Sequence, residues 1–406
     1  ASMLQRAYKF RLDPTPSQEV RLQSWLSKCC ELYNACLQER RDAWSKMRKS
    51  IGRYDQMKEL PAVKATRPDV AEVNAQVLQE VCARVDRAFQ GFFRRVRAGQ
   101  KPGHPRFRSW RRYDSFTHPQ AANATLADRR IRIPSFGHIR WRPWRSVGEL
   151  GTVKTLTIKR EADGWYAILS CEIPQPAPLP AAGRTSGLDV GLRNLVTTST
   201  GAVLGDLTPL KAAERRLRRT QKIVSRRVKG SNRRRKAVGI LARRHQNLAR
   251  ARKAQLDIIS RSLVVENDVI FIEDLSPGLR NAGPKNAQGR GMRRNWRHAA
   301  IGMLTKMLDY KAESAGRRVV RVDPAGTTVD CSRCENPVPK TRKDRVHRCS
   351  CGLVLDRDWN AAINIEQRGL RLLRGSGSQT GDPSGSEAAA SSRKTREARR
   401  SIGFYA

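Results

Sequence analysis

Four cysteines between residues 331 and 351 constrain the folding of this chain more than any other feature. They form a Cys-x-x-Cys pair and, 14 residues later, a tighter Cys-x-Cys pair: Cys331, Cys334, Cys349 and Cys351. This clustering predicts a four-thiolate zinc ribbon, in which a metal replaces the core that so short a segment cannot build. Glu335 stands where a knuckle glycine is usual, so His347 is kept as an alternative fourth ligand and unligated thiols as the alternative state. Because four thiolates leave no open coordination position, the predicted zinc is structural.

The remaining cysteines predict a reducing environment. Their number brings the total to nine, an odd count, and the chain shows no secretory signal, so a disulfide framework is not expected. We expect the protein to be cytoplasmic and to act at the prokaryotic nucleoid. The five are interpreted as small buried apolar side chains: Cys29, Cys30, Cys36, Cys82 and Cys171.

Three acids interrupt or follow apolar segments. Asp189 lies in "GLDVGLRNL", Glu273 in "VIFIEDL" and Asp358 in "DRDWNAAINI", at separations of 84 and 85 positions. A carboxylate in a buried strand is costly unless it is paired or binds metal. If folding brings the three together, they form the oxygen cage that Mg²⁺ prefers, and two such ions can support phosphodiester cleavage. Each acid alone could instead be structural, as a turn residue, a strand end or a helix cap.

Two neighbouring aspartates, Asp356 and Asp358, are candidates for the third acid, and the helical spacing favours Asp358. Ala361, Ala362 and Ile365 follow Asp358 by three, four and seven residues, so they share one helical face with it. Asp356 precedes the helix and suits its N-cap. We therefore expect Asp358 to point toward the sheet, with the two alanines allowing close approach of the helix.

The charge of the chain indicates its class of partner. It carries 80 lysines and arginines against 37 acidic residues, a net charge of +43, while 39% hydrophobic residues suffice for a packed core. Such an excess favours binding of polyanions by counterion release, with nucleic acid preferred over a membrane surface. No apolar run of about 18 residues is present, so no membrane-spanning helix is expected.

The Pro- and Ala-rich segment 176–183 is the predicted linker between two domains. Residues 1–175 combine short alternating strands with a helical insertion at about 14–125 and predict a β-barrel module. Residues 184–367 combine strands and helices. The segment 368–406 has linker composition and predicts a disordered tail.

Within the second domain we distinguish the zinc ribbon at 327–353 and a basic helical hairpin at 208–265. Residues 211–253 hold 18 lysines and arginines and one acid, which gives a net charge of +17 over 43 residues. Mutual repulsion among these positive charges would be severe without a polyanion, which predicts contact with nucleic acid. A charge run is, however, more often a solvated face. The candidate contacts near the turn are Arg226, Arg227, Arg233, Arg234 and Arg235, and an apolar stripe that includes Leu217, Ile223, Val228, Ile240 and Leu248 is expected to dock the helices.

The segment "RFRSWRRYDSF" interleaves arginines with aromatic rings. Arg106, Arg108 and Trp110 are candidates for stacking on bases and binding phosphates. The rings, Phe107, Trp110, Tyr113 and Phe116, could each be core residues instead.

These motifs together resemble a known family. "GLDVG", "IEDL" and "CSRC…CSCG…DRDWNAAINI", with "YKFRLDPTPSQ" and "FFRRVRAGQKPGHPRFRS" nearer the N-terminus, are similar to TnpB proteins of insertion sequences. They are also similar to the compact type V CRISPR effector nucleases. The resemblance covers most of residues 4–367.

The resemblance implies an α/β multidomain fold. It would comprise an RNase H-like (RuvC) nuclease domain with an inserted zinc ribbon and an N-terminal β-barrel, wedge-like module with a helical recognition insert. Asp189, Glu273 and Asp358 would hold two catalytic Mg²⁺, and one Zn²⁺ would be structural. Tyr54, Gln79 and Thr117 lie where residues that read a motif beside the target would lie, although Gln79 could be a plain helix-surface residue.

The implied function is RNA-guided cleavage of double-stranded DNA, with an omega-type or CRISPR guide RNA, water attacking the phosphorus and a 3′-hydroxyl leaving. A monomer is favoured and no membrane partner is expected. Three alternatives stay open: an RNA-guided repressor without nuclease activity, a guide-free RNase H-fold nuclease, and a transposase with a tyrosine nucleophile.

Overall fold

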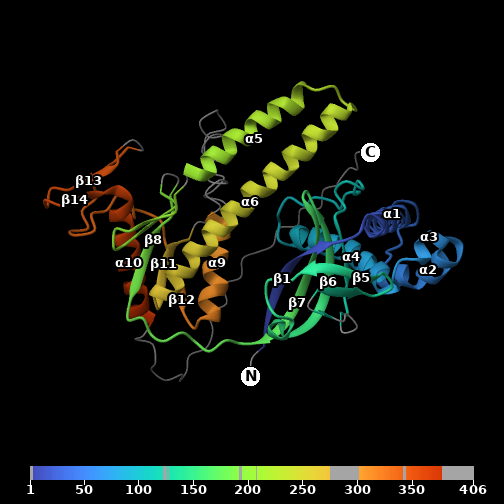
Figure 1. Cartoon of the computed structure of the whole chain (residues 1–406). Coiled ribbons are helices and arrows are strands. Elements are labelled where there is room, and N and C mark those ends of the chain that lie inside the picture. Colours follow the sequence, from blue (N-terminus) through green and yellow to red (C-terminus); the bar gives the residue numbers. More distant parts are fainter. Residues whose placement is uncertain are drawn as a thin grey trace, which may run out of the picture. The chain divides into compact units, whose positions relative to one another are not determined.

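The structure, a computed structural model, describes residues 3–121, 126–127, 129–191, 194–206, 208–274, 301–341 and 344–376 (Figure 1). The chain divides into two compact units. The first comprises 1–182, 205–266 and 300–318, and the second comprises 183–204, 267–299 and 319–406.

The first unit contains a seven-stranded sheet in the order β2-β6-β7-β1-β5-β4-β3, with antiparallel neighbours throughout. Its strands are β1 (Met3–Asp13), β2 (Ser115–His118), β3 (Leu126–Ala127), β4 (Arg130–Ile133), β5 (Gly137–Arg142), β6 (Thr152–Glu161) and β7 (Gly164–Pro174). Strand β1 pairs with β7 from Met3↔Pro174 to Leu12↔Trp165, so the first and last strands of this module lie together at its centre. Its closure into the predicted barrel stays a prediction.

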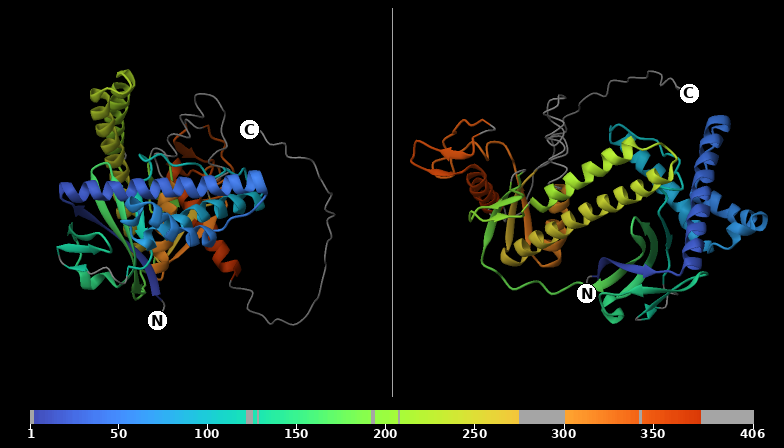
Figure 2. Two further views of the ribbon diagram at one scale, coloured as in Figure 1. Left: turned by 90° about the vertical axis from the view of Figure 1, so that its right-hand side faces the viewer. Right: turned by 45° about the horizontal axis from the view of Figure 1, so that its top comes forward.

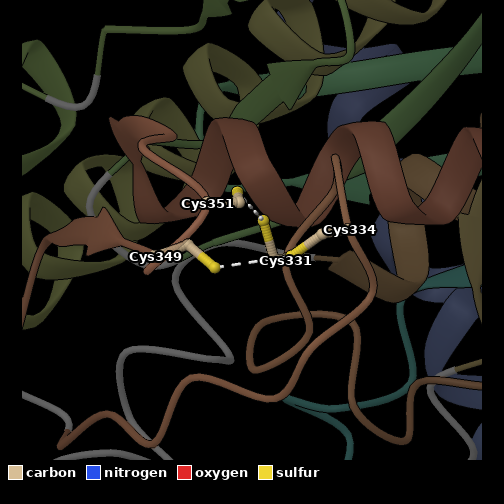
Figure 3. A group of neighbouring side chains, drawn as sticks. All are labelled: Cys331, Cys334, Cys349 and Cys351. Carbon is tan, nitrogen blue, oxygen red and sulfur yellow. Dashed lines mark hydrogen bonds between the residues drawn. The ribbon is translucent and has the colours of Figure 1, made fainter.

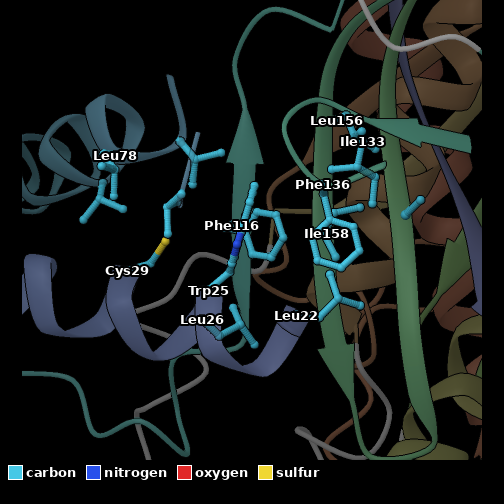
Figure 4. Packing of buried hydrophobic residues seen from close by; sticks show 14 of the residues in the cluster. Leu22, Trp25, Leu26, Cys29, Leu78, Phe116, Ile133, Phe136, Leu156 and Ile158 are labelled. Carbon is cyan, nitrogen blue, oxygen red and sulfur yellow. The ribbon is translucent and has the colours of Figure 1, made fainter. Parts of the chain in front are cut away.

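Helices fill the connection between β1 and β2, as predicted. They are α1 (Pro16–Met47), α2 (Arg53–Thr66), α3 (Pro68–Ala71) and α4 (Ala75–Arg97), and a short 3₁₀ helix, η1 (Val147–Leu150), precedes β6. Thr15 caps α1 in a capping box, in which its hydroxyl accepts from the amide of Gln18 and the Gln18 side chain accepts from the amide of Thr15. Trp25, Leu26 and Cys29 of α1 are buried with Phe116 and Ile158 of the sheet in one core (Figure 4).

The basic hairpin consists of α5 (Thr208–Arg226) and α6 (Asn232–Glu266), which run side by side (Figure 2). The turn between the two helices contains Gly230, which has a φ of +88°. Helix α6 also packs against α9 (Ile301–Ser314).

The predicted nuclease domain includes the basic hairpin, whereas the structure groups α5 and α6 with residues 1–182. The physical reason is a set of ion pairs that join Arg250 of α6 to Glu161 and Asp163 at the β6–β7 turn.

The second unit contains a five-stranded sheet in the order β10-β9-β8-β11-β12. The strands are β8 (Thr185–Asp189), β9 (Val196–Thr198), β10 (Val203–Leu204), β11 (Val269–Glu273) and β12 (Arg318–Val322). A two-stranded ribbon, β13 (Val346–Arg348) and β14 (Val354–Asp356), leads into α10 (Arg357–Ser376), which packs on β8 and β11.

The predicted tail requires a correction. Helix α10 continues through Ser376, so residues 368–376 are helical, because Leu370 and Leu373 pack against a core that includes Phe271. Residues 377–406 lie outside the described part of the chain.

Two sheets with packed helices confirm an α/β multidomain chain. None of its described helices is long and apolar enough to span a membrane.

Candidate functional site

Two of the three predicted acids end adjacent parallel strands. Strands β8 and β11 pair in register up to Leu188↔Ile272, and the next residue on each strand is an acid, Asp189 and Glu273. Parallel strands end at the same edge of a sheet, which explains how residues 84 positions apart become neighbours.

Both acids face the side of the sheet that α10 covers. Side chains alternate along a strand, so Asp189 shares a face with Gly187, and Glu273 shares one with Phe271. A β-carbon built at Gly187 would meet the backbone of Ala362 in α10, and one built at Gly369 of α10 would meet the Phe271 ring. The predicted close approach of α10 is therefore confirmed.

The third acid lies in the first turn of that helix. The Asp356 carboxylate accepts from the amide of Asp358 at 2.8 Å and from that of Trp359 at 3.3 Å, which confirms its predicted capping role. Asp358 is left to face the sheet, where its Oδ2 lies 3.9 Å from a β-carbon built at Gly191. All three acids thus lie near one another beyond the ends of β8 and β11.

The electrostatics of the site reflect this convergence. Burial raises the pKa of Asp189 well above its usual value, and the charges of Glu273 and Asp358 raise it further. Burial also raises the pKa of Glu273, against the opposing effects of a hydrogen bond from Thr327 and of the charge of Arg368.

This donor set fits a divalent cation. Three carboxylates are hard oxygen ligands, and a cation among them would offset the mutual repulsion that raises the pKa of Asp189. Within the described residues, only the four cysteines form a group of at least three ligands whose atoms all lie within 4.8 Å, so the three carboxylates are spaced more widely.

The four predicted zinc ligands converge on one point (Figure 3). The Sγ atoms of Cys331 and Cys351 are 3.6 Å apart, and those of Cys334 and Cys349 are 3.5 Å apart. Four sulfurs at about 2.3 Å from a tetrahedral Zn²⁺ would be separated by about 3.8 Å. The cluster therefore fits zinc in size and in ligand chemistry.

The knuckles also explain the unusual residue at 335. Glu335 has a φ of +65°, the left-handed conformation that favours glycine, and its amide donates to the Cys331 carbonyl at 2.9 Å. In the second knuckle Gly352 supplies this conformation, with a φ of +84°. His347, the alternative ligand, is buried and its Nδ1 contacts Lys340 Nζ, outside the cysteine cluster.

The predicted motif-reading residues lie on the first unit. Tyr54 of α2 is 63% exposed and stacks with the Arg53 guanidinium, and Gln79 is exposed on α4. Thr117 of β2 is half-buried, and its hydroxyl shares a hydrogen bond with Thr157 at 2.8 Å. Helix α4 packs against both α2 and β2, and a shared motif-reading site stays a prediction.

The predicted stacking segment divides into an exposed and a buried part. Trp110 is 56% exposed, and Arg106 and Arg108 are exposed beside it. The Arg108 backbone is fixed by Asn34, whose amide group makes two hydrogen bonds of 2.8 Å to it. Two rings of the same segment, Tyr113 and Phe116, are instead buried core residues.

The candidate contacts of the basic hairpin are exposed or partly exposed, and part of its predicted apolar stripe is exposed as well. Arg234 is partly exposed and the other four are exposed, namely Arg226, Arg227, Arg233 and Arg235. Leu217 and Leu248 dock the helices with Leu210. Leu241 packs against these three, whereas Val228 is 76% exposed and Ile223 and Ile240 are also exposed near the turn.

Sequence reasoning missed the polar residues that surround the acids. Thr327 donates to Glu273, and the buried amides of Asn360 and Asn364 bind the loop that carries Thr327. The signal in the sequence was the pair Asn360 and Asn364, which are four residues apart and therefore lie on one face of the predicted helix. If that face is buried, each amide requires a hydrogen-bond partner.

Comparison with known proteins identifies the family. Three family profiles match successive parts of the chain: "Helix-turn-helix domain" over 3–49, "Probable transposase" over 168–278 and "Cas12f1-like, TNB domain" over 302–365. "TnpB-like protein L79" of Acanthamoeba polyphaga mimivirus is 24% identical over 230 residues, 54% of this chain and 44% of its own length. A "Putative RNA-guided DNA endonuclease" of Streptomyces pristinaespiralis is 30% identical over 377 residues, which cover 90% of each chain. The chain belongs to the TnpB family.

Further relatives agree with the TnpB assignment. "Putative RNA-guided DNA endonuclease InsQ" of Escherichia coli K12 is 28% identical over 382 residues, 91% of this chain and 93% of that one. The solved "Cryo-EM structure of the Cas12f1-sgRNA-target DNA complex" is similar in fold, with a TM-score of 0.55, 13% identity and coverage of 90% of this chain and 99% of that one. In this TnpB chain the "Helix-turn-helix" match corresponds to β1 and α1.

Proposed function

We infer that this protein is an RNA-guided DNA endonuclease, the activity in the names of its full-length relatives. The observation that carries this inference for the chain itself is the convergence of Asp189, Glu273 and Asp358. Three acids from two strands and a helix, one of them deeply buried, are costly to assemble without a cation.

Asp189, Glu273 and Asp358 would hold the catalytic cations, and we propose two Mg²⁺. When bound, such ions supply activation of water and neutralisation of charge on the phosphate. The chain itself supplies the orientation of the ligands. Thr327 holds one oxygen of Glu273, and Asp356 holds the start of the helix that carries Asp358.

The domain functions follow as proposals. The nuclease domain was predicted to span residues 184–367. The part of this span that forms the second unit would be RNase H-like (RuvC), with one Zn²⁺ in the ribbon at 327–353. The first unit would be the β-barrel, wedge-like module with a helical insert that recognises guide RNA and the adjacent motif. The density of positive charge on the basic hairpin supports contact with nucleic acid, which a protein reads through backbone and shape when base pairing supplies sequence.

Two rivals make different demands on the same site. An RNA-guided repressor without nuclease activity requires no convergent acids, yet all three are present and together. A guide-free nuclease requires no guide-binding module.

The cytoplasmic location and the monomeric state remain predictions from the sequence.

The guide is tested first. The protein is purified from cells that carry its native flanking DNA, and the bound RNA is sequenced. We expect one discrete RNA with a constant part and an end that matches the locus. A broad mixture of cellular RNA would favour the guide-free nuclease.

The acid site is tested with that RNA, a matching DNA and Mg²⁺. Asp189→Ala should abolish cleavage and leave DNA binding unchanged, because the carboxylate holds cations and does not contact the guide. Asp42→Ala on α1 removes the same charge far along the chain and should cleave normally. Equal cleavage by Asp189→Ala and the unaltered protein would remove these acids from the mechanism.

A further inference from the structure

Helix α10 buries two amide side chains that bind one loop. Asn360 is fully buried and Asn364 is 5% exposed. Asn360 accepts from the amide of Ser332 at 3.0 Å and donates to the carbonyl of Asp330 at 2.8 Å. Asn364 donates to the carbonyls of Thr327 at 2.9 Å and Asp330 at 2.7 Å. Since an unpaired buried amide is costly, these hydrogen bonds fix the main chain from 327 to 332.

A third residue of the same helix also binds this loop. Arg368 donates to the Asp330 carboxylate at 2.6 Å and to the carbonyl of Ala325. Asn360, Asn364 and Arg368 are spaced by four residues and therefore lie along one face of α10. We call these three side chains the polar ladder. The ladder binds the loop at 327–332, which lies about 30 positions earlier in the chain.

The loop carries two functional groups. One is Cys331, a predicted zinc ligand. The other is Thr327, whose side chain is buried and whose Oγ1 lies 2.5 Å from Glu273 Oε1 and 3.1 Å from the carbonyl of Pro324. A hydroxyl has one proton to donate, and the shorter distance assigns it to the Glu273 carboxylate.

We propose that Thr327 is a positioning residue that fixes the carboxylate of Glu273 for cation binding, and that the zinc ribbon and the polar ladder hold Thr327 in place. This inference rests on the proposed function, in which Glu273 binds a catalytic cation. The same helix carries Asp358 in its first turn, so the ladder ties two of the three acids to one rigid element. Loss of zinc would then loosen Glu273 although no cysteine contacts it.

The test replaces the hydroxyl without changing the shape of the side chain. Thr327→Val keeps the branched side chain and removes the donor, whereas Thr327→Ser keeps the donor. Binding of Mn²⁺, as a probe of the cation site, is measured by electron paramagnetic resonance on the protein without nucleic acid. We expect Thr327→Val to weaken Mn²⁺ binding roughly tenfold, and Thr327→Ser to bind within about twofold of the unaltered protein.

Cleavage with Mg²⁺ is measured on the same variants. Thr327→Val should need about tenfold more Mg²⁺ for half-maximal cleavage, with recovery in Thr327→Ser. Equal Mn²⁺ binding by Thr327→Val and the unaltered protein would overturn the positioning role. So would equal loss in both Thr327 variants, because a structural defect is not rescued by the hydroxyl.

Asp189→Asn separates this inference from the proposed function. If Asp189→Asn binds Mn²⁺ and cleaves normally, the cation site of the proposed function fails. If Asp189→Asn loses both while Thr327→Val loses neither, the positioning role alone fails.

The coupling to zinc is tested by Cys334→Ser, alone and with Thr327→Val. We expect Cys334→Ser to weaken Mn²⁺ binding and Thr327→Val to add little in the double variant, because the hydroxyl is already displaced. Asn364→Leu, which keeps the cysteines and releases the loop from α10, should have the same effect. Fully additive losses, or normal Mn²⁺ binding in both Cys334→Ser and Asn364→Leu, would overturn the coupling.

Discussion

At the scale of single residues, Gly187 determines how closely α10 approaches the acid site. A β-carbon at this position would lie 2.6 Å from the amide nitrogen of Glu366 and would also meet the carbonyl of Ala362. Both contacts are backbone atoms of α10, which cannot rotate away as a side chain would. The helix therefore has to shift if residue 187 gains a side chain, and it would carry Asp358 with it.

Gly187→Ala should destabilise the second unit by about 1–3 kcal/mol, the usual cost of overpacking, and slow cleavage by displacing Asp358. Thermal unfolding and cleavage rates are the measurements. The matched control is Gly239→Ala in the third turn of α6, where an added β-carbon meets nothing within 4 Å. This variant should be stabilised by up to about 1 kcal/mol, since alanine favours helix. Equal stability of the two variants would contradict the close packing.

The raised pKa of Asp189 predicts how the stability of the protein depends on pH. Its pKa is raised by burial and by the neighbouring acids, so the folded state binds this proton more tightly than the unfolded state does. The stability that the protonated form contributes is therefore lost as pH rises from about 4, the ordinary pKa of aspartate, through the raised value. Without metal, Asp189→Asn should melt a few degrees higher than the unaltered protein near pH 7.

That difference should shrink toward pH 4, and Mg²⁺ should raise the melting temperature of the unaltered protein more than that of Asp189→Asn. Asp42→Asn on α1 serves as the control. A constant difference between pH 4 and 8 would show that the charge of Asp189 is not its cause.

At the scale of elements, α6 is attached to the sheet of the first unit by one ionic cluster. Arg250 donates to Glu161 at 2.9 Å, to Asp163 at 2.7 Å and to the Tyr166 hydroxyl at 2.8 Å, and Gln246 donates to both acids at 2.7 Å. Burial alone would raise the pKa of Asp163, but the hydrogen bonds, from Arg250 first, hold it below its usual range. Two acids at a hairpin turn thus compensate part of the charge of a strongly basic helix.

Arg250→Ala should destabilise the first unit by about 1 kcal/mol at neutral pH, a modest value because the cluster is partly exposed. Since the pKa of Asp163 is lowered in the folded state, the stabilisation is present above about pH 4 and disappears as pH falls further. Melting temperatures at pH 7 and pH 3 test this, with Lys253→Ala as a control for charge on the same helix. A loss in Lys253→Ala as large as in Arg250→Ala would indicate general charge effects instead.

At the scale of the whole molecule, the chain interleaves its two units. Residues 205–266 and 300–318 belong to the first, although they lie between segments of the second. The second unit brings together acids from three separate segments, and its ribbon segment has four cysteines where a packed core would otherwise be needed. Its stability should therefore depend on metal.

Purified protein should contain one zinc per chain, and Cys349→Ser should lower the content to nearly none. The variant should lose more than about 3 kcal/mol in the second unit, because metal binding and folding are coupled in such ribbons. Elemental analysis and thermal unfolding are the measurements. Cys171→Ala, in the core of the first unit, should retain its zinc. Unchanged melting of zinc-free protein would show that the thiols alone maintain this segment.

The amino-acid sequence by itself determined the local features of this protein. Cysteine spacing predicted the metal cluster, Asp356 was predicted as the N-cap of the helix that carries Asp358, and the apolar runs that end in acids predicted β8 and β11. These signals are short-range, because capping, periodicity and knuckle spacing depend on neighbours within a few positions. The helical insertion was predicted only as a whole span. Within it, Pro61 disfavours α2 locally, and tertiary packing of Leu60 outweighs that preference.

Only the tertiary structure decided which distant residues meet. The register of β8 and β11 places Asp189 beside Glu273, and the missing β-carbon of Gly187 lets α10 bring Asp358 to them. It also decided that Tyr113 and Phe116 belong to the core and that α6 belongs to the first unit. These outcomes depend on packing and pairing between segments far apart in the chain, which no local pattern encodes.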